Sequence, residues 1–358
     1  MTQTAQRTTK SRKEIVATQE TISWVVTTLK MPLFDFFVDI FANLFDPKKR
    51  IFLGYIFLSI LIAFAYLIFA KKQSLQHTLK EIFSKSVLLS RSAKRDYIMF
   101  VINRSITIFV SPLLLTKLAI ATVIFYYLHK LTWITKGMLD TYNPVLIAFL
   151  FTFFIFILDD LTKYVVHRLM HRIPILWALH KVHHSAETLN PITIYRTHPL
   201  EGIVFTLRAS FTQGIAISTF IFLFGNKVDL LTILGANIFI FTFNVAGSNL
   251  RHSHIYIRYW HWLEFFLISP AQHQIHHSLD EKHYDKNFGS TLSVWDWIGG
   301  SLHLSEERRP NKLGLSKNEF MENPSTFYMY VGPIVEITSI SLSKLKIVFR
   351  VLQKLFWW

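Results

Sequence analysis

The clustering of histidines is the strongest constraint on how this chain can fold. Fourteen of its sixteen histidines lie between positions 167 and 303. Residues three and four apart share one face of a helix, so closely spaced histidines would present their rings in one direction. Neutral imidazole is the commonest protein ligand of transition metals, so we expect the fold to bring these rings together around metal. The three boxes are His167 and His171; His180, His183 and His184; and His273, His276 and His277.

The number and kind of these ligands favour two metal ions. Eight imidazoles exceed the four ligands of a tetrahedral zinc site. The chain has no cysteine, which excludes thiolate ligands and iron–sulfur clusters. Soluble di-iron proteins use Glu and Glu-x-x-His pairs on bundle helices, but no glutamate occupies a box here. The boxes therefore predict a dimetal site with nearly all-nitrogen ligands, and these ligands leave iron, zinc and copper open.

The composition indicates a membrane protein. Of the 358 residues 51% are hydrophobic, and 33 are phenylalanine, which is unusual for a soluble domain. The net charge of +15 raises the possibility of nucleic-acid binding, but no nucleic-acid module is recognisable. The basic residues lie mainly between apolar runs, so we predict that they contact anionic lipid headgroups and that the chain binds no nucleic acid.

Several apolar runs are long enough to cross a bilayer. The runs at 51–70 and 106–128 are predicted spans, and the second contains Pro112 and Lys117. A third, at 139–158, continues without a helix breaker into the first box, so that box should lie on the aqueous extension of a membrane helix. The runs at 203–225 and 229–247 are predicted to form a helical hairpin that dips into the bilayer.

This topology places all three boxes on one face of the membrane, because a hairpin returns to the side that it left. The same face collects the basic residues of 159–202 and 248–358, whereas the opposite loop holds only Lys130 and Lys136. By the positive-inside rule, the metal side should be cytoplasmic. The prediction is an all-α, multi-pass integral membrane protein, with about four to five transmembrane or hairpin helices and a cytosolic helical cap that holds the dimetal site.

The chain is predicted to have four segments. Its beginning should be a polar tail and an interfacial helix, and its end a basic amphipathic helix on the membrane surface. The segments are 1–50, polar tail and interfacial segment; 51–130, N-terminal membrane helices; 131–305, catalytic domain; and 306–358, basic amphipathic tail.

Further residues around the boxes form a recognisable pattern. Beside the first two boxes stand Asp160, Tyr164, Trp177, Asn190, Thr193, Arg196, His198, Pro199 and Glu201. Around the third stand His252, His254, Pro270, Asp285, Asn287, Phe288, Gly289, Trp295 and Asp296. The pattern resembles the fatty acid hydroxylase/sterol desaturase superfamily over roughly residues 97–305, and it is specific for the superfamily but not for a substrate.

The resemblance implies an integral-membrane, non-haem di-iron oxygenase that hydroxylates or desaturates a fatty acyl, sterol, isoprenoid or ether lipid. It implies that the eight boxed histidines and His252 bind two iron ions. Many relatives have Asn at the position of His254, which leaves open whether His252 or His254 binds metal. The chain has no dinucleotide-binding fingerprint or haem-attachment signature. A ferredoxin, a b-type cytochrome or a reduced pterin would therefore supply electrons.

Other candidate residues allow two interpretations. His198 could bind metal, or it could order the loop that contains Arg196 and Glu201. Asp160 lies on the same helical stripe as His167 and could accept a ligand's second N–H, or it could mark the membrane interface. Asp285, Asn287 and Trp295 could orient ligands or order a loop, whereas His261, His283 and His303 are expected to be ordinary interfacial or supporting residues.

Two other classes of protein also use clustered histidines. A metal transporter, or a metal-binding membrane protein without oxygenase activity, should place polar ligands inside its spans. Here Arg208 and Asn244 are the main polar residues in the apolar runs. A b-type haem protein would need axial histidines on facing helices, which contiguous boxes outside the apolar runs do not favour.

Overall fold

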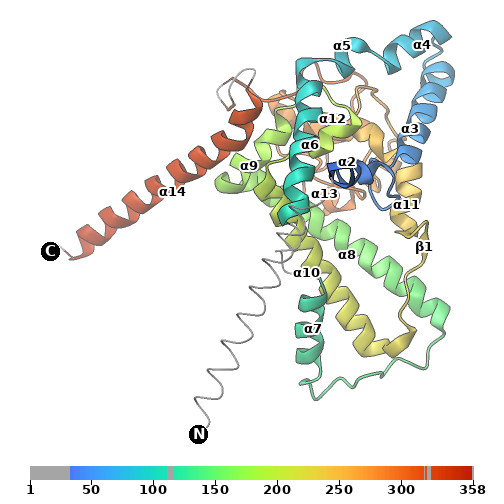
Figure 1. Ribbon diagram of the computed structural model, residues 1–358, viewed down its shortest axis with the longest axis vertical. Coiled ribbons are helices and arrows are strands. Elements are labelled where there is room, and N and C mark those ends of the chain that lie inside the picture. The colour runs from blue at the N-terminus through green and yellow to red at the C-terminus, as the bar shows by residue number, and fades with distance from the viewer. Residues whose placement is uncertain (1–32, 111–116, 318, 321–323, 357–358) are drawn as a thin grey trace.

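Helices form nearly all of the regular structure in this computed structural model, which describes residues 33–110, 117–317, 319–320 and 324–356 (Figure 1). The tail predicted for residues 1–20 lies outside the described residues. The helices are α2 (Leu33–Phe41), α3 (Leu53–Ala65), α4 (Leu75–Ile82), α5 (Lys85–Leu88), α6 (Arg91–Val110), α7 (Lys117–Leu128), α8 (Pro144–Arg172), α9 (Pro174–His184), α10 (Pro199–Phe224), α11 (Ile238–Val245), α12 (Pro270–His276), α13 (Val294–Ile298) and α14 (Thr326–Phe356).

Three helical segments of the described chain are long and apolar enough to cross a membrane: Leu53–Ala70, Pro144–Arg172 and Pro199–Lys227. The first joins α3 to a π-helical turn, η2 (Tyr66–Ala70), and coincides with the predicted span at 51–70. The other two are α8 and α10 with its 3-10 extension, which lie side by side along most of their length (Figure 1). The chain is therefore a mostly helical membrane protein.

The predicted span at 106–128 is not tested as a whole, because residues 111–116, Pro112 among them, lie outside the described residues. The described residues of this run lie in α6, up to Val110, and in α7, from Lys117 onward. The apolar part of α7 covers Leu118–Leu128, which rises only about 16 Å, against a hydrocarbon thickness of about 30 Å. Instead of spanning alone, α7 packs closely on α10, where a Cβ on Gly214 would lie 2.7 Å from the Ile120 side chain.

The return leg of the predicted hairpin, 229–247, is not one helix. It contains a two-stranded antiparallel ladder of β1 (Thr232–Ile233) and β2 (Ala236–Asn237), followed by the eight-residue α11. Leu234 and Gly235 turn the ladder with φ angles of 49° and 75°. The Asn237 side chain then caps α11 by accepting a hydrogen bond from the Phe239 amide. These local turn and capping preferences override the apolar composition.

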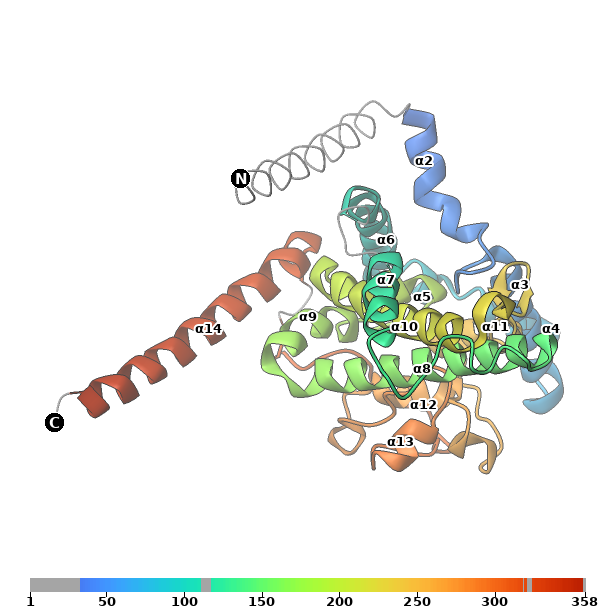
Figure 2. The ribbon, with the colours of Figure 1, turned by 90° about the horizontal axis from the view of Figure 1, so that it is seen from below.

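Helix capping sets the positions of the boxes. The Asn143 side chain caps α8, Pro144 opens it, and the helix continues unbroken through the first box. Only Ile173 separates α8 from α9, which carries the second box. The third box lies on α12, where Ser269 and Gln272 form a reciprocal capping box. In Figure 2, α12 and α13 lie on one side of α8, whereas α6 and α10 lie on the other.

The C-terminal helix lies within the segment 306–358 that was predicted as a basic amphipathic tail. It begins at Thr326, and α14 extends away from the rest of the protein (Figures 1 and 2). Its first turns are anchored on α9, where Lys181 forms an ion pair with Glu336 and donates a hydrogen bond to the Glu319 carbonyl. Residues 357–358 lie outside the described part.

A buried ion pair fixes α6 to the segment that follows the second box. Arg196 Nε lies 2.7 Å from Asp96 Oδ1, and both side chains are fully buried. The Asn190 amide and the Thr193 hydroxyl also donate to Asp96. Burial raises the pKa of Asp96, although Arg196 and these hydrogen bonds lower it. The desolvation cost is therefore large, and either charge would be strongly destabilising if it were left alone.

We expect Asp96→Asn to lower the free energy of unfolding by about 3–5 kcal/mol, because Arg196 would keep a buried charge without its counter-ion. Thermal unfolding of the purified chain in detergent would measure the effect. Glu307→Gln is the matched control, since it neutralises an exposed carboxylate and should change stability by no more than about 0.5 kcal/mol. Equal midpoints for the two variants would contradict this role of the ion pair.

Candidate metal centre

Nine histidines from α8, α9, α12 and the 3-10 helix η6 (Ser248–His252) converge in two groups. In each group the candidate ligand atoms lie within 4.8 Å of one another. The larger group is His167, His171, His180, His184 and His276, and the smaller is His183, His252, His273 and His277. The structure thus brings together all eight boxed histidines and His252. The second and third boxes each contribute to both groups, which places the two candidate ion sites side by side.

Hydrogen bonds fix the orientation of three rings in the larger group. His167 Nδ1 lies 2.7 Å from the Phe288 carbonyl oxygen, and His276 Nδ1 lies 2.7 Å from that of Lys286. His180 Nδ1 lies 2.8 Å from Glu201 Oε1. A carbonyl or carboxylate oxygen can only accept, so each Nδ1 donates a proton. In a neutral ring the Nε2 atom then carries no proton, and its free lone pair can bind metal.

These lone pairs face one another. His167 Nε2 and His276 Nε2 are 3.1 Å apart, and neither carries a proton to donate, so the contact is not a hydrogen bond. A metal ion at about 2.0–2.1 Å from each nitrogen would hold two ligands roughly 2.9–3.4 Å apart, as calculated for octahedral and tetrahedral geometry. The Nε2 atoms of His171, His180 and His184 are also buried without a partner. The larger group therefore fits a metal ion.

The smaller group has the same spacing. His252 Nε2 lies 3.2 Å from His183 Nε2 and 3.0 Å from His273 Nε2, and both nitrogens of His277 are buried without a partner. His252 differs in one respect, because Arg50 donates to its Nδ1 over 2.8 Å. Metal binding at Nε2 of His252 would require loss of the remaining ring proton, and the charge of Arg50 favours that loss.

The environment keeps these rings neutral. Burial, with a smaller contribution from neighbouring imidazoles, lowers the pKa of His183, His184 and His277 well below the usual value. Burial also lowers the pKa of His276 to about 3. Since the shifts are downward, the proton is lost well below pH 7, and the rings offer their lone pairs at neutral pH.

Glu201 was not singled out as a site residue by the sequence analysis, although it stands in the recognised His198-Pro-Leu-Glu pattern. Its side chain is 2% exposed, and it lies in the first turn of α10. Because its Oε1 accepts from His180, it supplies the carboxylate partner typical of a metal-bound histidine. No sequence spacing linked Glu201 to His180, since the two residues lie on different helices.

The structure gives Asp160 a different role from the one considered above. Its carboxylate accepts hydrogen bonds from the amides of Thr291 and Leu292 and from Trp295 Nε1, rather than from a histidine ring. Asp160 therefore fixes the 291–295 loop to α8. Asp296 similarly accepts from the Phe288 amide, which holds the loop whose carbonyl faces His167.

Asn287 acts through the same loop. Its amide nitrogen donates to the Gln272 and His303 carbonyls, and its oxygen accepts from the His303 amide. Asp285 and Asn287 both have positive φ angles, of 58° and 59°, so the Lys286 carbonyl can face His276. Asp285 is partly exposed, and its Oδ1 lies 3.9 Å from His171 Nδ1. Both residues thus support the rings from outside the two groups.

His198 and His254, the two less certain candidates, do not join either group. His198 Nδ1 caps α10 by accepting from the Leu200 amide, and its Nε2 contacts the Tyr330 carbonyl. His254 Nε2 lies 2.7 Å from the Glu81 carbonyl. Each ring is occupied by a structural contact distant from the other boxes, so the smaller group takes His252 and not His254.

A cavity of about 220 Å³ reaches the larger group. Ligand candidates His171, His184 and His276 line it. Trp177, Asp285 and Glu319 line it as well, and they come from α9 and from loops outside the apolar helices. In the larger group His180, His184 and His276 are buried and His167 and His171 are half-buried, and the group is accessible through this opening.

The nine histidines lie in a part of the chain that is similar to known proteins. The family model described as Fatty acid hydroxylase matches residues 152–301, a segment that contains all nine histidines. Alkylglycerol monooxygenase of Homo sapiens is 28% identical over 149 residues, which are 42% of this chain and 30% of that protein. The Danio rerio protein of the same name is 30% identical over 40% of this chain and 28% of its own length.

A second kind of relative matches the same region. Lathosterol oxidase of Homo sapiens is 28% identical over 158 residues, covering 44% of each chain. The match thus spans about 30% of the alkylglycerol monooxygenases and under half of lathosterol oxidase. No solved structure matches the chain significantly. All of these relatives are named as enzymes that oxidise lipids, and that the nine histidines bind metal in this chain stays a prediction.

We expect His184→Ala and His273→Ala each to lower the metal content by about one ion per chain, because each variant removes a ligand from a different group. Elemental analysis of the purified chain would measure this. His261→Ala is the matched control, since His261 is exposed and belongs to neither group. Full metal content in both box variants would contradict the assignment.

We expect Glu201→Gln to weaken metal binding about 10- to 100-fold, because the His180 ring would lose its carboxylate partner. Competition with a chelator of known affinity would give the dissociation constants. Glu187→Gln is the control, since it changes an exposed carboxylate outside both groups, and it should leave the dissociation constants unchanged. Unchanged affinity in Glu201→Gln would show that the contact only stabilises α10.

Proposed function

We propose that this chain, whose residues 152–301 carry the fatty acid hydroxylase domain of the fatty acid hydroxylase/sterol desaturase superfamily, is a membrane-bound, non-haem di-iron oxygenase. It would use O₂ and an external electron donor to hydroxylate or desaturate a C–H bond of a lipid. The observation that carries the proposal is the convergence of unprotonated imidazole nitrogens, 3.1 Å apart between His167 and His276, at the end of an apolar helix.

The protein residues would bind the metal and control its surroundings. The larger and smaller histidine groups would each hold one iron, and the iron pair would supply the activation of O₂ that an unactivated C–H bond requires. Glu201 and the carbonyls of Lys286 and Phe288 hold three rings in the metal-binding tautomer. Seven of the nine histidines are buried, which would limit the access of bulk water, so the protein would contribute positioning and a largely dry environment.

The position of the site suits a substrate dissolved in the membrane. His167 and His171 lie in the last two turns of α8, whose apolar part precedes them. A multi-pass arrangement with the metal side facing the cytoplasm would follow the distribution of basic residues. The proposal includes the four predicted segments, with the catalytic domain at 131–305.

Electrons would come from a separate partner. The chain has no cysteine and hence no iron–sulfur cluster of its own. A ferredoxin, a b-type cytochrome or a reduced pterin could approach the opening beside Trp177 and Asp285, because these two residues belong to segments outside the apolar helices. This opening would separate the electron path from the lipid path.

A metal transporter is the competing function, and two contacts disfavour it. Arg208 is occupied by Asp159 and Thr162, which fixes α10 to α8. Asn244 accepts a hydrogen bond from the Ser248 hydroxyl. The two main polar residues of the apolar runs thus make contacts within the protein, whereas a conducting path needs polar groups that are available along the span.

We expect lipid extracts treated with the iron-loaded chain, O₂ and an electron donor to contain a lipid that has gained one oxygen atom or lost two hydrogen atoms. His183→Ala and His276→Ala should lower product formation at least roughly 100-fold, because each removes a ligand from a different group. Mass spectrometry of the lipids would identify the product.

The control variant His261→Ala should keep the wild-type rate. Iron quantitation on the same samples separates loss of metal from loss of fold. Full oxidation by both box variants, or uptake of Zn²⁺ into liposomes that contain the apo chain, would refute the oxygenase proposal.

A further inference from the structure

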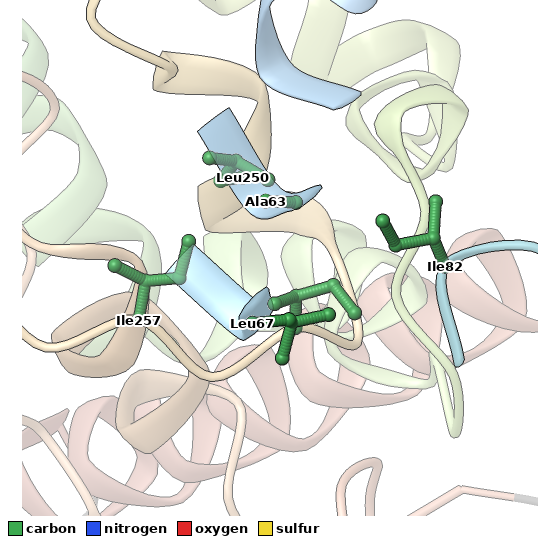
Figure 3. Close-up of a cluster of buried hydrophobic side chains, with 6 residues drawn as sticks. Ala63, Leu67, Ile82, Leu250 and Ile257 are labelled. Carbon is green, nitrogen blue, oxygen red and sulfur yellow. The ribbon is translucent and has the colours of Figure 1, made fainter. Parts of the chain in front are cut away.

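A second cavity, of about 170 Å³, lies between α3 and residues of η6 and the segment that follows it. Its walls are mostly aliphatic. Figure 3 shows part of this wall, where Ala63 on α3 approaches Leu250, with Ile82 nearby; Ile255 belongs to the same buried cluster. Phe83 also lines the cavity and is 52% exposed, so the cavity reaches the protein surface.

Two polar atoms in this apolar cavity have no partner among the described residues. They are Ser59 Oγ and Asn249 Oδ1, and the side chains are 4% and 1% exposed. The other amide and hydroxyl side chains of the lining are satisfied: Asn190 donates to Asp96, and Ser253 donates to the Leu250 carbonyl. Leaving a buried polar group unpaired is costly, so the two orphan atoms point to a ligand.

The hydrogen bonds of Asn249 define what that ligand must offer. Its Nδ2 donates to the Arg50 carbonyl over 2.8 Å, which fixes the orientation of the amide. The free Oδ1 therefore needs a donor, whereas the Ser59 hydroxyl can either donate or accept. An alcohol meets both requirements, but an ether or an ester cannot donate.

The cavity is also close to the proposed chemistry. Asn249 precedes His252 by three residues, which is one turn of the 3-10 helix η6. Ser253 and His254, which directly follow His252, line the cavity. On its other side stands α3, whose apolar residues form a candidate membrane span. A ligand here would have its polar end near a metal ligand and its chain directed along a membrane helix.

We propose that this cavity binds the hydroxyl-bearing end of a lipid alcohol, which donates to Asn249 Oδ1 and pairs with Ser59 Oγ. This inference rests on the proposed oxygenase function, which it deepens by naming the substrate class. At roughly 30 Å³ for each water-sized group, the cavity holds only one end of a lipid. The remainder would lie along α3 in the bilayer.

The first test is a binding measurement on the iron-loaded full chain in detergent. The probe is a long-chain primary alcohol that carries a photoreactive diazirine, and mass spectrometry locates its crosslinks. We expect crosslinks on α3 and on residues 249–255. Unlabelled 1-hexadecanol should displace the probe at a concentration roughly three- to tenfold lower than hexadecyl methyl ether, because the ether cannot donate a hydrogen bond.

Two variants test the cavity itself. Ala63→Leu would fill it and should abolish the crosslinks, whereas Ala65→Leu, on the exposed face of α3, should preserve them. Ser59→Ala should bring the displacing concentrations of alcohol and ether toward equality with little change in the ether value. If Ala63→Leu fails to fold, as judged from its iron content, the displacing concentrations of alcohol and ether in the milder Ser59→Ala variant test the cavity instead.

Several outcomes would overturn the inference: equal displacement by alcohol and ether in the wild type, crosslinks elsewhere, or persistence of the crosslinks in a folded Ala63→Leu variant. Equal displacement would mean that ordered water satisfies the two polar atoms. Failure of the oxygenase proposal is distinguishable, because the chain would then bind the alcohol selectively but oxidise no lipid. Oxidation that is unaffected by Ala63→Leu would sink the cavity assignment alone.

Discussion

The proposed metal centre depends on an arrangement of imidazoles that would be unfavourable without a cation. His167 and His276 each donate their only ring proton to a backbone carbonyl, and their bare nitrogens then face each other across 3.1 Å. Nothing in either ring can relieve this contact, since both atoms are acceptors. A bound cation would turn this repulsive contact into a link between α8 and α12. The loop contacts of Asp160, Asp296 and Asn287 all serve to keep the carbonyls in place.

In the proposed metal-bound protein, metal binding and folding would be coupled. The two groups join four segments that are far apart in sequence, and the second and third boxes contribute to both of them. Each ion would crosslink α9 to α12, and the larger group would add α8 while the smaller would add η6. Part of the free energy of metal binding would then appear as free energy of folding. The buried Asp96–Arg196 pair supplies an independent link between α6 and the segment after the second box.

The sequence was informative where one periodicity or one residue type dominates. The apolar run at 51–70 and the helix that continues into the first box were predicted because composition alone determines them. The span at 106–128 stays a prediction, because the residues between α6 and α7 lie outside the described part of the chain. The leg at 229–247 failed because Leu234, Gly235 and Asn237 specify a turn and a cap that average hydropathy does not register. Glu201, and not Asp160, contacts a histidine ring. The sequence did not indicate this, because partners on different helices have no characteristic spacing in the sequence.

The length of α8 has a consequence for how the site meets the bilayer. From Pro144 to His167 the helix rises about 35 Å, slightly more than the roughly 30 Å hydrocarbon thickness of a membrane. Since α8 is unbroken, the depth of the proposed ions would be tied to the far side of the bilayer. The length of the helix would then set the level at which a membrane-embedded lipid chain meets the metal centre. Under the proposed function, a thicker or thinner bilayer would shift that level along the lipid chain and so change which carbon is oxidised.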